Sequence, residues 1–254
     1  MNMKKIGIVV IACIAALSLM LVGCGSSSKK LVKEGTLTVL TNPEYEPFEY
    51  IEGDQIVGYD MDLAKLVADK LGLKLEIVNM DFDSLIPAVT SGNKGDIIFA
   101  GMSVTPERQK QVSFTEFYYV DNMSIAMPKS ASFDKAALNA ADQTIAVQRG
   151  TTGEDWAKEN FPNAQIAEFA GVADCFAAVQ AGKANAVCTN TAVASQYISA
   201  TYTDFENKLT EATDEAYAAA VAQSNKALLD DVNKAIAALQ KEGKLAELEA
   251  KWLG

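Results

Sequence analysis

The sequence DMDLAKLVADKLGLKLEIV, residues 60–78, contains the alternation from which the fold class can be predicted. Its apolar residues first recur at spacings of three and four, and Gly72 ends that run, which predicts an amphipathic helix over residues 60–71. A short β-rich run at residues 75–78 follows directly and predicts a strand. A helix joined so closely to a strand is typical of α/β domains.

The same alternation extends on both sides of this stretch. A strand is expected at residues 37–40, a short helix at 84–90 and another strand at 96–100, and their short connections favour a parallel sheet. A second unit of this kind has expected strands at 144–148, 165–169 and 184–189 and expected helices near 153–161, 172–181 and 192–200. A strand at 216–222, a long helix with Leu228, Leu229, Val232, Ile236 and Leu239 on one face, and a final short helix complete the chain. Two α/β units in tandem predict two lobes.

The first thirty residues have the pattern of a secretory signal. Lys4 and Lys5 precede an uncharged apolar run over residues 6–22. A retained transmembrane anchor is the alternative, because a run of this length could at a stretch span a bilayer. The sequence LVGC at residues 21–24 resembles the lipobox of bacterial lipoproteins, which implies removal of residues 1–23 and a lipid on Cys24. Residues 24–30, rich in Ser, then form a flexible tether.

The composition excludes several classes of function. A chain of 254 residues with 49% hydrophobic content can bury a substantial core. It contains no His, which excludes catalytic triads with His, a His general base and most zinc sites. Loss of Lys4 and Lys5 with the signal changes the net charge from −11 to −13, which argues against a nucleic-acid partner. Neither a metal nor a cofactor is expected.

Two cysteines remain in the folded part of the chain, because Cys13 leaves with the signal and Cys24 carries the lipid. Cys175 is expected on a helix and Cys188 on the strand that follows it. Outside the cytosol such a pair could be oxidised, but sequence does not establish the geometry that a disulfide needs. A disulfide and two buried free thiols both remain open.

Residues 101–108, GMSVTPER, follow a predicted buried strand and have the pattern of a helix start. Thr105 suits the N-cap and Pro106 the first helical position. Arg108 lies within a turn of this start, and its guanidinium could make two parallel hydrogen bonds to a carboxylate, with Ser103 and backbone N–H groups adding others. A capped surface helix with a solvated Arg108 is the alternative.

Residues 148–154, QRGTTGE, form a matching strand-to-helix turn in the second unit. Both turns follow strands, and in open α/β sheets ligands lie at the carboxyl ends of strands. The second turn is not a phosphate loop, because the lysine and the spacing of that motif are missing. Tyr45 and Phe82 also follow predicted strands, where aromatic side chains can clamp a ligand; core packing is the alternative for both.

Several of these motifs together resemble a known family. They are YEPF (45–48), GYDMDL (58–63), GMSVTPER (101–108), VSFT (112–115), GTT (150–152) and KWLG (251–254). Over residues 36–254 the chain is similar to the polar amino-acid family of solute-binding proteins that serve ABC importers. The resemblance implies an α/β, type II periplasmic-binding-protein fold with two lobes, each a mainly parallel sheet flanked by helices, and two hinge crossings. Lobe 1 would hold residues 31–122 and 216–254, and lobe 2 residues 123–215.

The resemblance also implies a set of ligand-binding residues. Arg108 would grip the ligand carboxylate, helped by Gly101, Ser103 and Thr152. The full set expected is Asn42, Tyr45, Phe82, Gly101, Ser103, Arg108, Gln148, Thr151, Thr152 and Asn190. In it Tyr45 and Phe82 would pack on the ligand and Gln148 would contact its polar end.

Asn190 is a departure from the family pattern, which has an acid there to neutralise the ligand's α-ammonium, and Asn42 replaces an acid found in some members. An amide provides no counter-charge. The ligand therefore lacks an α-amine, or its ammonium finds Glu44 or another acid, or weak binding is offset by aromatic packing. A strongly basic ligand side chain is not expected, because none of the matched contact positions is acidic.

The expected function is the substrate-binding component of an ABC importer. It would be a monomer, lipid-anchored at the extracytoplasmic face of the cell membrane, that captures a small carboxylate-bearing solute by closure of its lobes, without chemistry, and docks on a membrane permease. One alternative is a secreted dehydratase-like enzyme on the same fold, which would need a positioned acid such as Glu44 or Glu154. The other is a ligand-sensing module.

Overall fold

The computed structural model of the protein describes residues 30–254. The predicted signal peptide, the lipid on Cys24 and the tether up to residue 29 lie outside these residues. Within them, no helix combines the length and the apolar character needed to cross a membrane.

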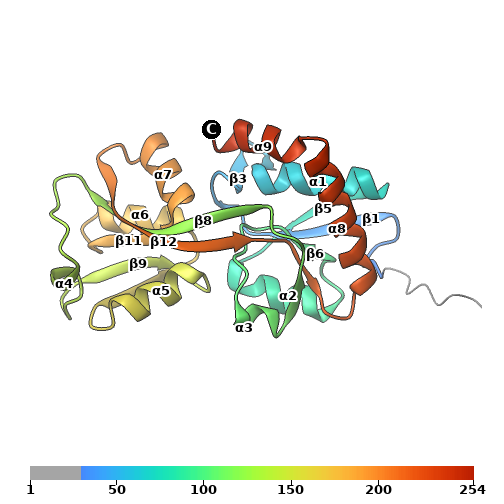
Figure 1. The fold of residues 1–254 in the computed structure, drawn as a ribbon. Coiled ribbons are helices and arrows are strands. Elements are labelled where there is room, and N and C mark those ends of the chain that lie inside the picture. The colour runs from blue at the N-terminus through green and yellow to red at the C-terminus, as the bar shows by residue number, and fades with distance from the viewer. Residues whose placement is uncertain (1–29) are drawn as a thin grey trace, which may run out of the picture.

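The described chain forms two lobes, each built on a five-stranded sheet with helices on both faces (Figure 1). The first sheet has the order β5 (Lys74–Asn79), β1 (Thr36–Thr41), β6 (Ile97–Ile98), β13 (Ala220–Ala222) and β7 (Val112–Phe114). β1 is parallel to β5 and β6, whereas β13 is antiparallel to both of its neighbours. The three parallel strands end at the same edge of the sheet, which faces the other lobe.

The central strands β1 and β6 of the first sheet are buried on both faces, because their side chains alternate between two apolar clusters. Leu37 and Val39 of β1 belong to one cluster and Leu40 to the other. The helices of this lobe are α1 (Tyr59–Leu71), η1 (Phe82–Ser84), α2 (Leu85–Ser91), α3 (Pro106–Gln109), α8 (Lys226–Lys241) and α9 (Lys244–Trp252). A small sheet of β2 (Glu44–Tyr45), β3 (Glu49–Glu52) and β4 (Gln55–Val57) lies between β1 and α1 in the chain.

The second lobe repeats the architecture. Its sheet has the order β10 (Gln165–Phe169), β9 (Thr144–Gln148), β11 (Ala186–Asn190), β8 (Tyr119–Pro128) and β12 (Phe205–Tyr217). The first three strands are parallel, and β8 and β12 are antiparallel to their neighbours. Its helices are α4 (Lys135–Leu138), α5 (Thr152–Asn160), α6 (Val172–Gln180) and α7 (Thr191–Ala200).

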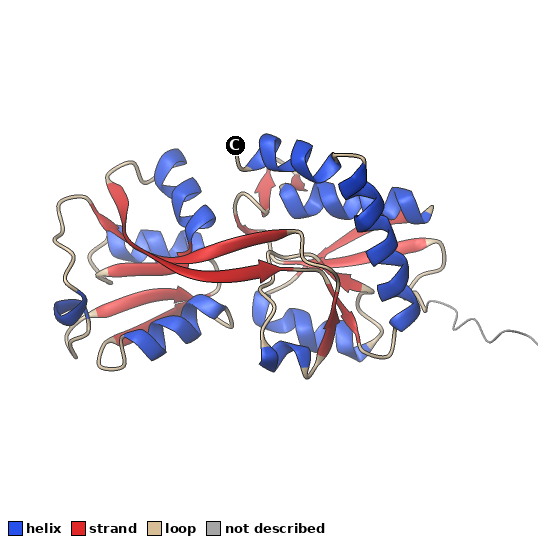
Figure 2. Ribbon diagram, in the orientation of Figure 1, coloured by secondary structure: helices blue, strands red, loops and turns tan. Residues whose placement is uncertain are grey.

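β8 and β12 connect the lobes as one antiparallel ribbon, which Figures 1 and 2 show running from the second lobe to the first. The pairing is continuous except for register shifts, the larger of which falls between Glu211 and Glu215. Asp214 has a φ of 49° there, a left-handed conformation that few non-glycine residues adopt. The irregularity therefore lies where β12 leaves the second lobe.

The structure confirms the predicted fold class, including two strands whose bounds agree residue for residue, Thr144–Gln148 and Gln165–Phe169. The predicted strand at 216–222 is wrong as a single element. It is divided between the end of β12 and β13, because the N–H of Ala218 donates to the carbonyl of Met102 and that of Ala219 to the hydroxyl of Thr115. Most of β12, the β2–β4 sheet and β7 were not predicted.

Cys175 and Cys188 are both free and buried, so of the two states that the sequence left open the structure has the free thiols rather than the disulfide. Cys175 on α6 packs in the cluster that includes Val187, whereas Cys188 packs in the cluster under α5. Successive residues of a strand face opposite sides of the sheet, and this directs Cys188 away from α6.

Two carboxyl groups are buried together in the first lobe, on Glu49 and Asp60. Neither carboxyl oxygen of Glu49 has a hydrogen-bond partner among residues 30–254, whereas Asp60 Oδ2 accepts from the N–H of Gly101 at 2.8 Å and from the hydroxyl of Tyr118 at 2.6 Å. Burial raises the pKa of Asp60 to about 7, and burial together with Asp60 raises the pKa of Glu49 well above its ordinary value.

These shifts predict that stability falls as the pH rises. Both carboxyls hold protons in the folded chain that the unfolded chain releases near pH 4, so their contribution is complete below pH 4 and is lost as the pH rises through their folded pKa values. Glu49→Gln should make the free energy of unfolding fall less steeply between pH 5 and 8, by up to about 1.4 kcal/mol per pH unit, because one titrating proton is removed. Urea unfolding across that range measures it.

Glu52→Gln, an exposed substitution on the same strand β3, is the matched control and should leave the slope unchanged. If Glu49→Gln had the pH dependence of the unaltered protein, the buried carboxyl would not be holding its proton.

Candidate ligand-binding site between the two lobes

A small cavity lies where the two sheets face each other. It encloses about 10 Å³, roughly the space of one water molecule. Its lining consists of Tyr45, Phe82, Gly101, Ser103 and Arg108 from the first lobe and Thr151, Thr152 and Asn190 from the second. Side chains from both lobes therefore close over the cavity, and a ligand the size of an amino acid can enter only if the lobes separate.

Arg108 occupies the centre of this interface. Thr105 caps α3 and Pro106 is its first residue, as predicted, but α3 is only one turn long, so the site depends on the Arg108 side chain rather than on a helix terminus. Nη1 of Arg108 donates to the carbonyl of Ser103 at 2.7 Å, and Nη2 donates to the carbonyl of Gly150 at 3.0 Å. The guanidinium thus joins a loop of one lobe to a turn of the other.

The charge of Arg108 is buried, with only 8% of the residue exposed. Burial lowers the pKa of Arg108, whereas the negative charges of Glu215 and Asp155 act to raise it. Within residues 30–254 the guanidinium forms no ion pair, and two of its five N–H groups are bonded to the two carbonyls. A guanidinium stays protonated in proteins, so an anion is the physical complement of this position.

Aromatic rings border the guanidinium and the loop before it. The Phe82 ring lies 5.3 Å from the Arg108 guanidinium carbon, within the range of a cation–π contact. The Tyr45 ring packs on Gly101, whose φ is +51° and where a Cβ atom would lie 3.0 Å from that ring. The hydroxyl of Tyr45 donates to Oδ1 of Asn190 across the cleft. Both rings thus lie at the cavity, and Gly101 allows the close approach of Tyr45.

The two threonines of the second lobe have different partners. The hydroxyl of Thr151 donates to the carbonyl of Gln148 at 2.7 Å and accepts from the N–H of Glu154, which caps α5. The hydroxyl of Thr152 points instead into the cleft, where it meets Ser103 at 3.4 Å. Thr152 therefore has the hydroxyl that can reach a ligand, whereas that of Thr151 holds the turn together.

Asn42 and Gln148 do not line the cavity. They bond to each other between the lobes, Nε2 of Gln148 donating to Oδ1 of Asn42 at 2.7 Å and also to the carbonyl of Ala170 at 3.0 Å. Both residues are buried, and Oε1 of Gln148 has no hydrogen-bond partner in the described part of the chain. The structure thus places this amide pair beside the cavity, at the end of strands β1 and β9.

Glu215 is a site residue that sequence reasoning missed. It lies in β12, in the charged and Thr-rich stretch TEATDEAY that has no clear apolar alternation. The N–H of Val104 donates to the carbonyl of Ala216, which brings β12 beside the loop before Arg108. This long-range pairing has no local sequence signal, so the position of Glu215 at the cleft could not be predicted from the sequence pattern around it.

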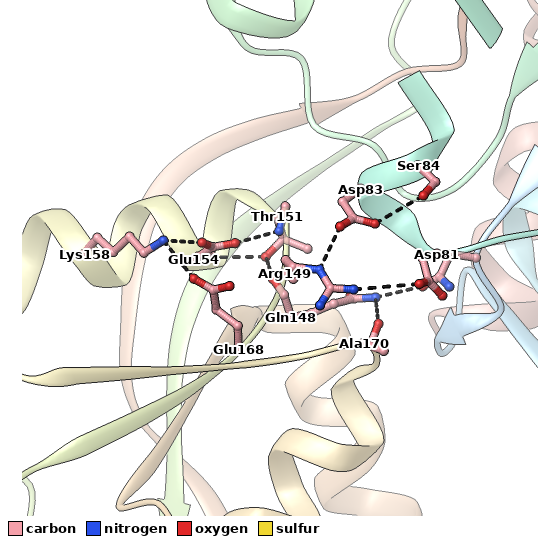
Figure 3. A network of polar contacts seen from close by, with 12 residues as sticks. Asp81, Asp83, Ser84, Gln148, Arg149, Thr151, Glu154, Lys158, Glu168 and Ala170 are labelled. Carbon is pink, nitrogen blue, oxygen red and sulfur yellow. Dashed lines mark hydrogen bonds and ion pairs between the residues drawn. The ribbon is translucent and has the colours of Figure 1, made fainter. Parts of the chain in front are cut away.

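Charged side chains also join the lobes at the rim (Figure 3). Nε of Arg149 lies 2.7 Å from a carboxylate oxygen of Asp83, and its Nη2 lies 3.7 Å from Asp81. Next to it, Gly150 has a φ of +78°, and a Cβ atom there would lie 2.9 Å from the Cβ of Asp83. The turn at 148–151 therefore makes close backbone and charge contacts with the opposite lobe.

No group of three or more His, Cys, Asp or Glu side chains within residues 30–254 is arranged to hold a metal ion.

Comparison with known proteins relates this geometry to one family. The model of the bacterial extracellular solute-binding proteins, family 3, matches residues 37–254. The arginine-binding extracellular protein ArtP of Bacillus subtilis (strain 168) is 32% identical over 254 residues, which cover 98% of each chain.

Solved structures with the same fold include an ancestral arginine-binding protein, determined with arginine and with glutamine. The arginine complex has a TM-score of 0.81 and 34% identity, and the match covers 87% of this chain and 99% of that one. An ancestral amino acid-binding protein, described as a precursor of cyclohexadienyl dehydratase, has a TM-score of 0.79 and 36% identity, with 87% and 96% coverage.

The Arg149 contacts predict a shift between closed and open forms. Arg149→Gln removes the inter-lobe ion pair with Asp83, so the open form should become more populated, by no more than about fivefold because the pair is exposed to solvent. Distances between spin labels on the two lobes measure it. Lys33→Gln, which removes an exposed ion pair within the first lobe, is the control; equal label distances in both variants would contradict a role of Arg149 in closure.

Proposed function

Because this chain belongs to family 3 of the bacterial extracellular solute-binding proteins, we propose that it captures an amino acid outside the cytoplasm for uptake by an ABC importer. The observation that carries the proposal is the position of Arg108. Its buried guanidinium lies between the two lobes, and two of its five N–H groups are bonded to carbonyls of the described residues. The remaining N–H groups can bind a carboxylate that both lobes enclose.

The proposed mechanism is capture by closure of the lobes. The ligand binds the first lobe while the cleft is open, and its added contacts with the second lobe favour the closed form. In the closed form Arg108 exchanges the two carbonyls for the ligand carboxylate, and the hydroxyls of Ser103 and Thr152 add hydrogen bonds. Gly101 borders the ligand without donating to the carboxylate, because its N–H is bonded to Asp60. The hinges fall near residues 122–123 and 215–216, in the β8–β12 ribbon, whose irregular register at Glu211 and Glu215 supports bending there.

Further ligand contacts follow from the positions of the other side chains. Tyr45 and Phe82 pack on the body of the ligand, and Asn190 lies at its amino end. The amides of Asn42 and Gln148 separate from each other and meet the polar end of the ligand side chain, which supports a polar L-amino acid. The names of the relatives, which refer to arginine and glutamine, indicate L-arginine and L-glutamine as the first probes.

The proposal extends to location and partners. The signal at residues 1–23 exports the chain, a lipid on Cys24 with residues 24–30 as tether holds it at the membrane, and the closed monomer docks on the permease. Lipoprotein anchors with more than one acyl chain bind membranes stably, whereas a single chain holds only marginally.

The two acids that the sequence offered for a dehydratase are not placed for that reaction. The acids considered for that reaction, Glu44 and Glu154, do not line the cavity. Glu154 accepts from the N–H of Gly150 and pairs with Lys158, and the Glu44 carboxylate lies against Gly171. Recovery of unchanged ligand after incubation, measured by mass spectrometry, distinguishes the carrier from an enzyme.

The role of Arg108 is tested by substitution. Arg108→Ala should weaken binding of L-arginine or L-glutamine by at least about 30-fold, or about 2 kcal/mol, because it removes a buried partner of the carboxylate. Arg108→Lys keeps the charge but loses the paired donors, and its affinity should lie between the two. Isothermal titration calorimetry measures both, with thermal unfolding as a check that each variant folds.

Lys110→Ala, an exposed substitution next to the same turn, is the control and should bind as the unaltered protein does. Unchanged affinity in a folded Arg108→Ala variant would show that the ligand carboxylate binds elsewhere.

A further inference from the structure

Glu215 brings a second charge into the cleft. One carboxylate oxygen, Oε2, accepts hydrogen bonds from the hydroxyl of Ser103 at 2.6 Å, from the hydroxyl of Thr152 at 2.6 Å and from the amide of Asn190 at 3.1 Å. All three donors line the cavity. Ser103 belongs to the first lobe and Thr152 and Asn190 to the second, so the carboxylate sits at the point where the lobes meet.

We propose that Glu215 receives the α-ammonium group of the ligand, so that the site selects zwitterionic amino acids over the corresponding simple carboxylic acids. This inference rests on the proposed function, because it concerns the ligand that Arg108 binds. It assigns to β12 the counter-charge that Asn190, at the end of β11, does not carry.

The distribution of charge in the site supports the proposal. The lining residues other than Arg108 carry no formal charge, and burial raises the pKa of Tyr45, which keeps that ring neutral. Glu215 accepts hydrogen bonds from three of these lining residues but forms no ion pair with Arg108, although its negative charge acts to raise the pKa of Arg108. One cation thus lines the cavity, and one anion lies directly behind three of its lining residues, so a ligand with a carboxylate and an ammonium on one carbon complements both.

The hydroxyls of Ser103 and Thr152 strengthen the selection. Each hydroxyl has one proton, and in this structure both protons are directed to Glu215. A ligand ammonium that donates to Glu215 replaces those bonds, which leaves the two hydroxyls free to donate to the ligand carboxylate. A ligand without an ammonium offers Glu215 no donor, so two anions compete for the same two protons and repel each other.

Other acids near the cleft are less suited to this role. Glu44 lies on β2 with its carboxylate against Gly171, and its pKa is raised by burial and by Asp174. Asp155 on α5 is exposed. Asp121 accepts from the N–H groups of Asn122 and Ala192 and from the hydroxyl of Tyr217, and none of these three residues lines the cavity.

The test compares each probe with its deaminated analogue. The pairs are L-arginine with 5-guanidinopentanoic acid and L-glutamine with glutaramic acid, titrated calorimetrically into the full chain. The unaltered protein should prefer the amino acid of the pair that it binds by at least about 100-fold. Glu215→Gln should lower this ratio at least about tenfold, through weaker binding of the amino acid and equal or tighter binding of the analogue, since charged hydrogen bonds are about twice as strong as neutral ones.

Three further variants locate the effect. Glu211→Gln lies in the same strand, is exposed, and should leave the ratio unchanged. Asn190→Asp combined with Glu215→Gln returns the charge to the neighbouring residue and should recover part of the ratio. Glu215→Asp, which keeps the charge on a shorter side chain, should give an intermediate ratio and replaces Glu215→Gln should that variant fail to fold.

The outcomes separate this inference from the proposed function. An unaltered ratio in Glu215→Gln, or equal binding of both members of a pair by the unaltered protein, overturns the role of Glu215 and leaves amino-acid capture standing. A loss of the ratio in Glu211→Gln as large as in Glu215→Gln also overturns it. Binding of neither pair by the folded protein would overturn the proposed function, and the role of Glu215 with it.

Discussion

The buried guanidinium of Arg108 is the constraint on which the rest of the structure depends. A buried cation is costly unless hydrogen bonds and opposite charge compensate it. Here two carbonyls, one from each lobe, satisfy part of the group, and the negative charge of Glu215 acts on it without forming an ion pair. The closed form is therefore stabilised around a position whose best partner is an anion, and this links closure to ligand binding.

The fold places the charges that this link requires. The parallel strands of both sheets end at the cleft, so the loops that follow β6 and β9 meet there. The β8–β12 ribbon crosses beside them, and the contact of Val104 with Ala216 aligns Ser103 with the acidic side chain of Glu215. The ribbon thus acts as the connection between lobes and also supplies a charged residue to the site.

The sequence predicted the parts of this arrangement that have local signals. The helix over residues 60–71, the strands β9 and β10 and the turns around Arg108 and Thr152 follow from apolar spacing, capping residues and glycines. Eight of the ten predicted site residues line one cavity; Asn42 and Gln148 bond to each other beside it. β12 was missed because its pairing with β8 is long-range and its residues are largely polar, so Glu215 could be found only from tertiary contacts. The state of Cys175 and Cys188 could not be predicted either, because the two thiols are separated by the face of β11 on which Cys188 lies.

A crystal structure of the protein with a bound amino acid tests the central claim most directly. The account predicts the α-carboxylate between the lobes, within hydrogen-bond distance of the Arg108 guanidinium and of the hydroxyls of Ser103 and Thr152, with the α-ammonium on Glu215. A ligand bound away from the cleft, with Arg108 still bonded to the carbonyls of Ser103 and Gly150, would contradict it.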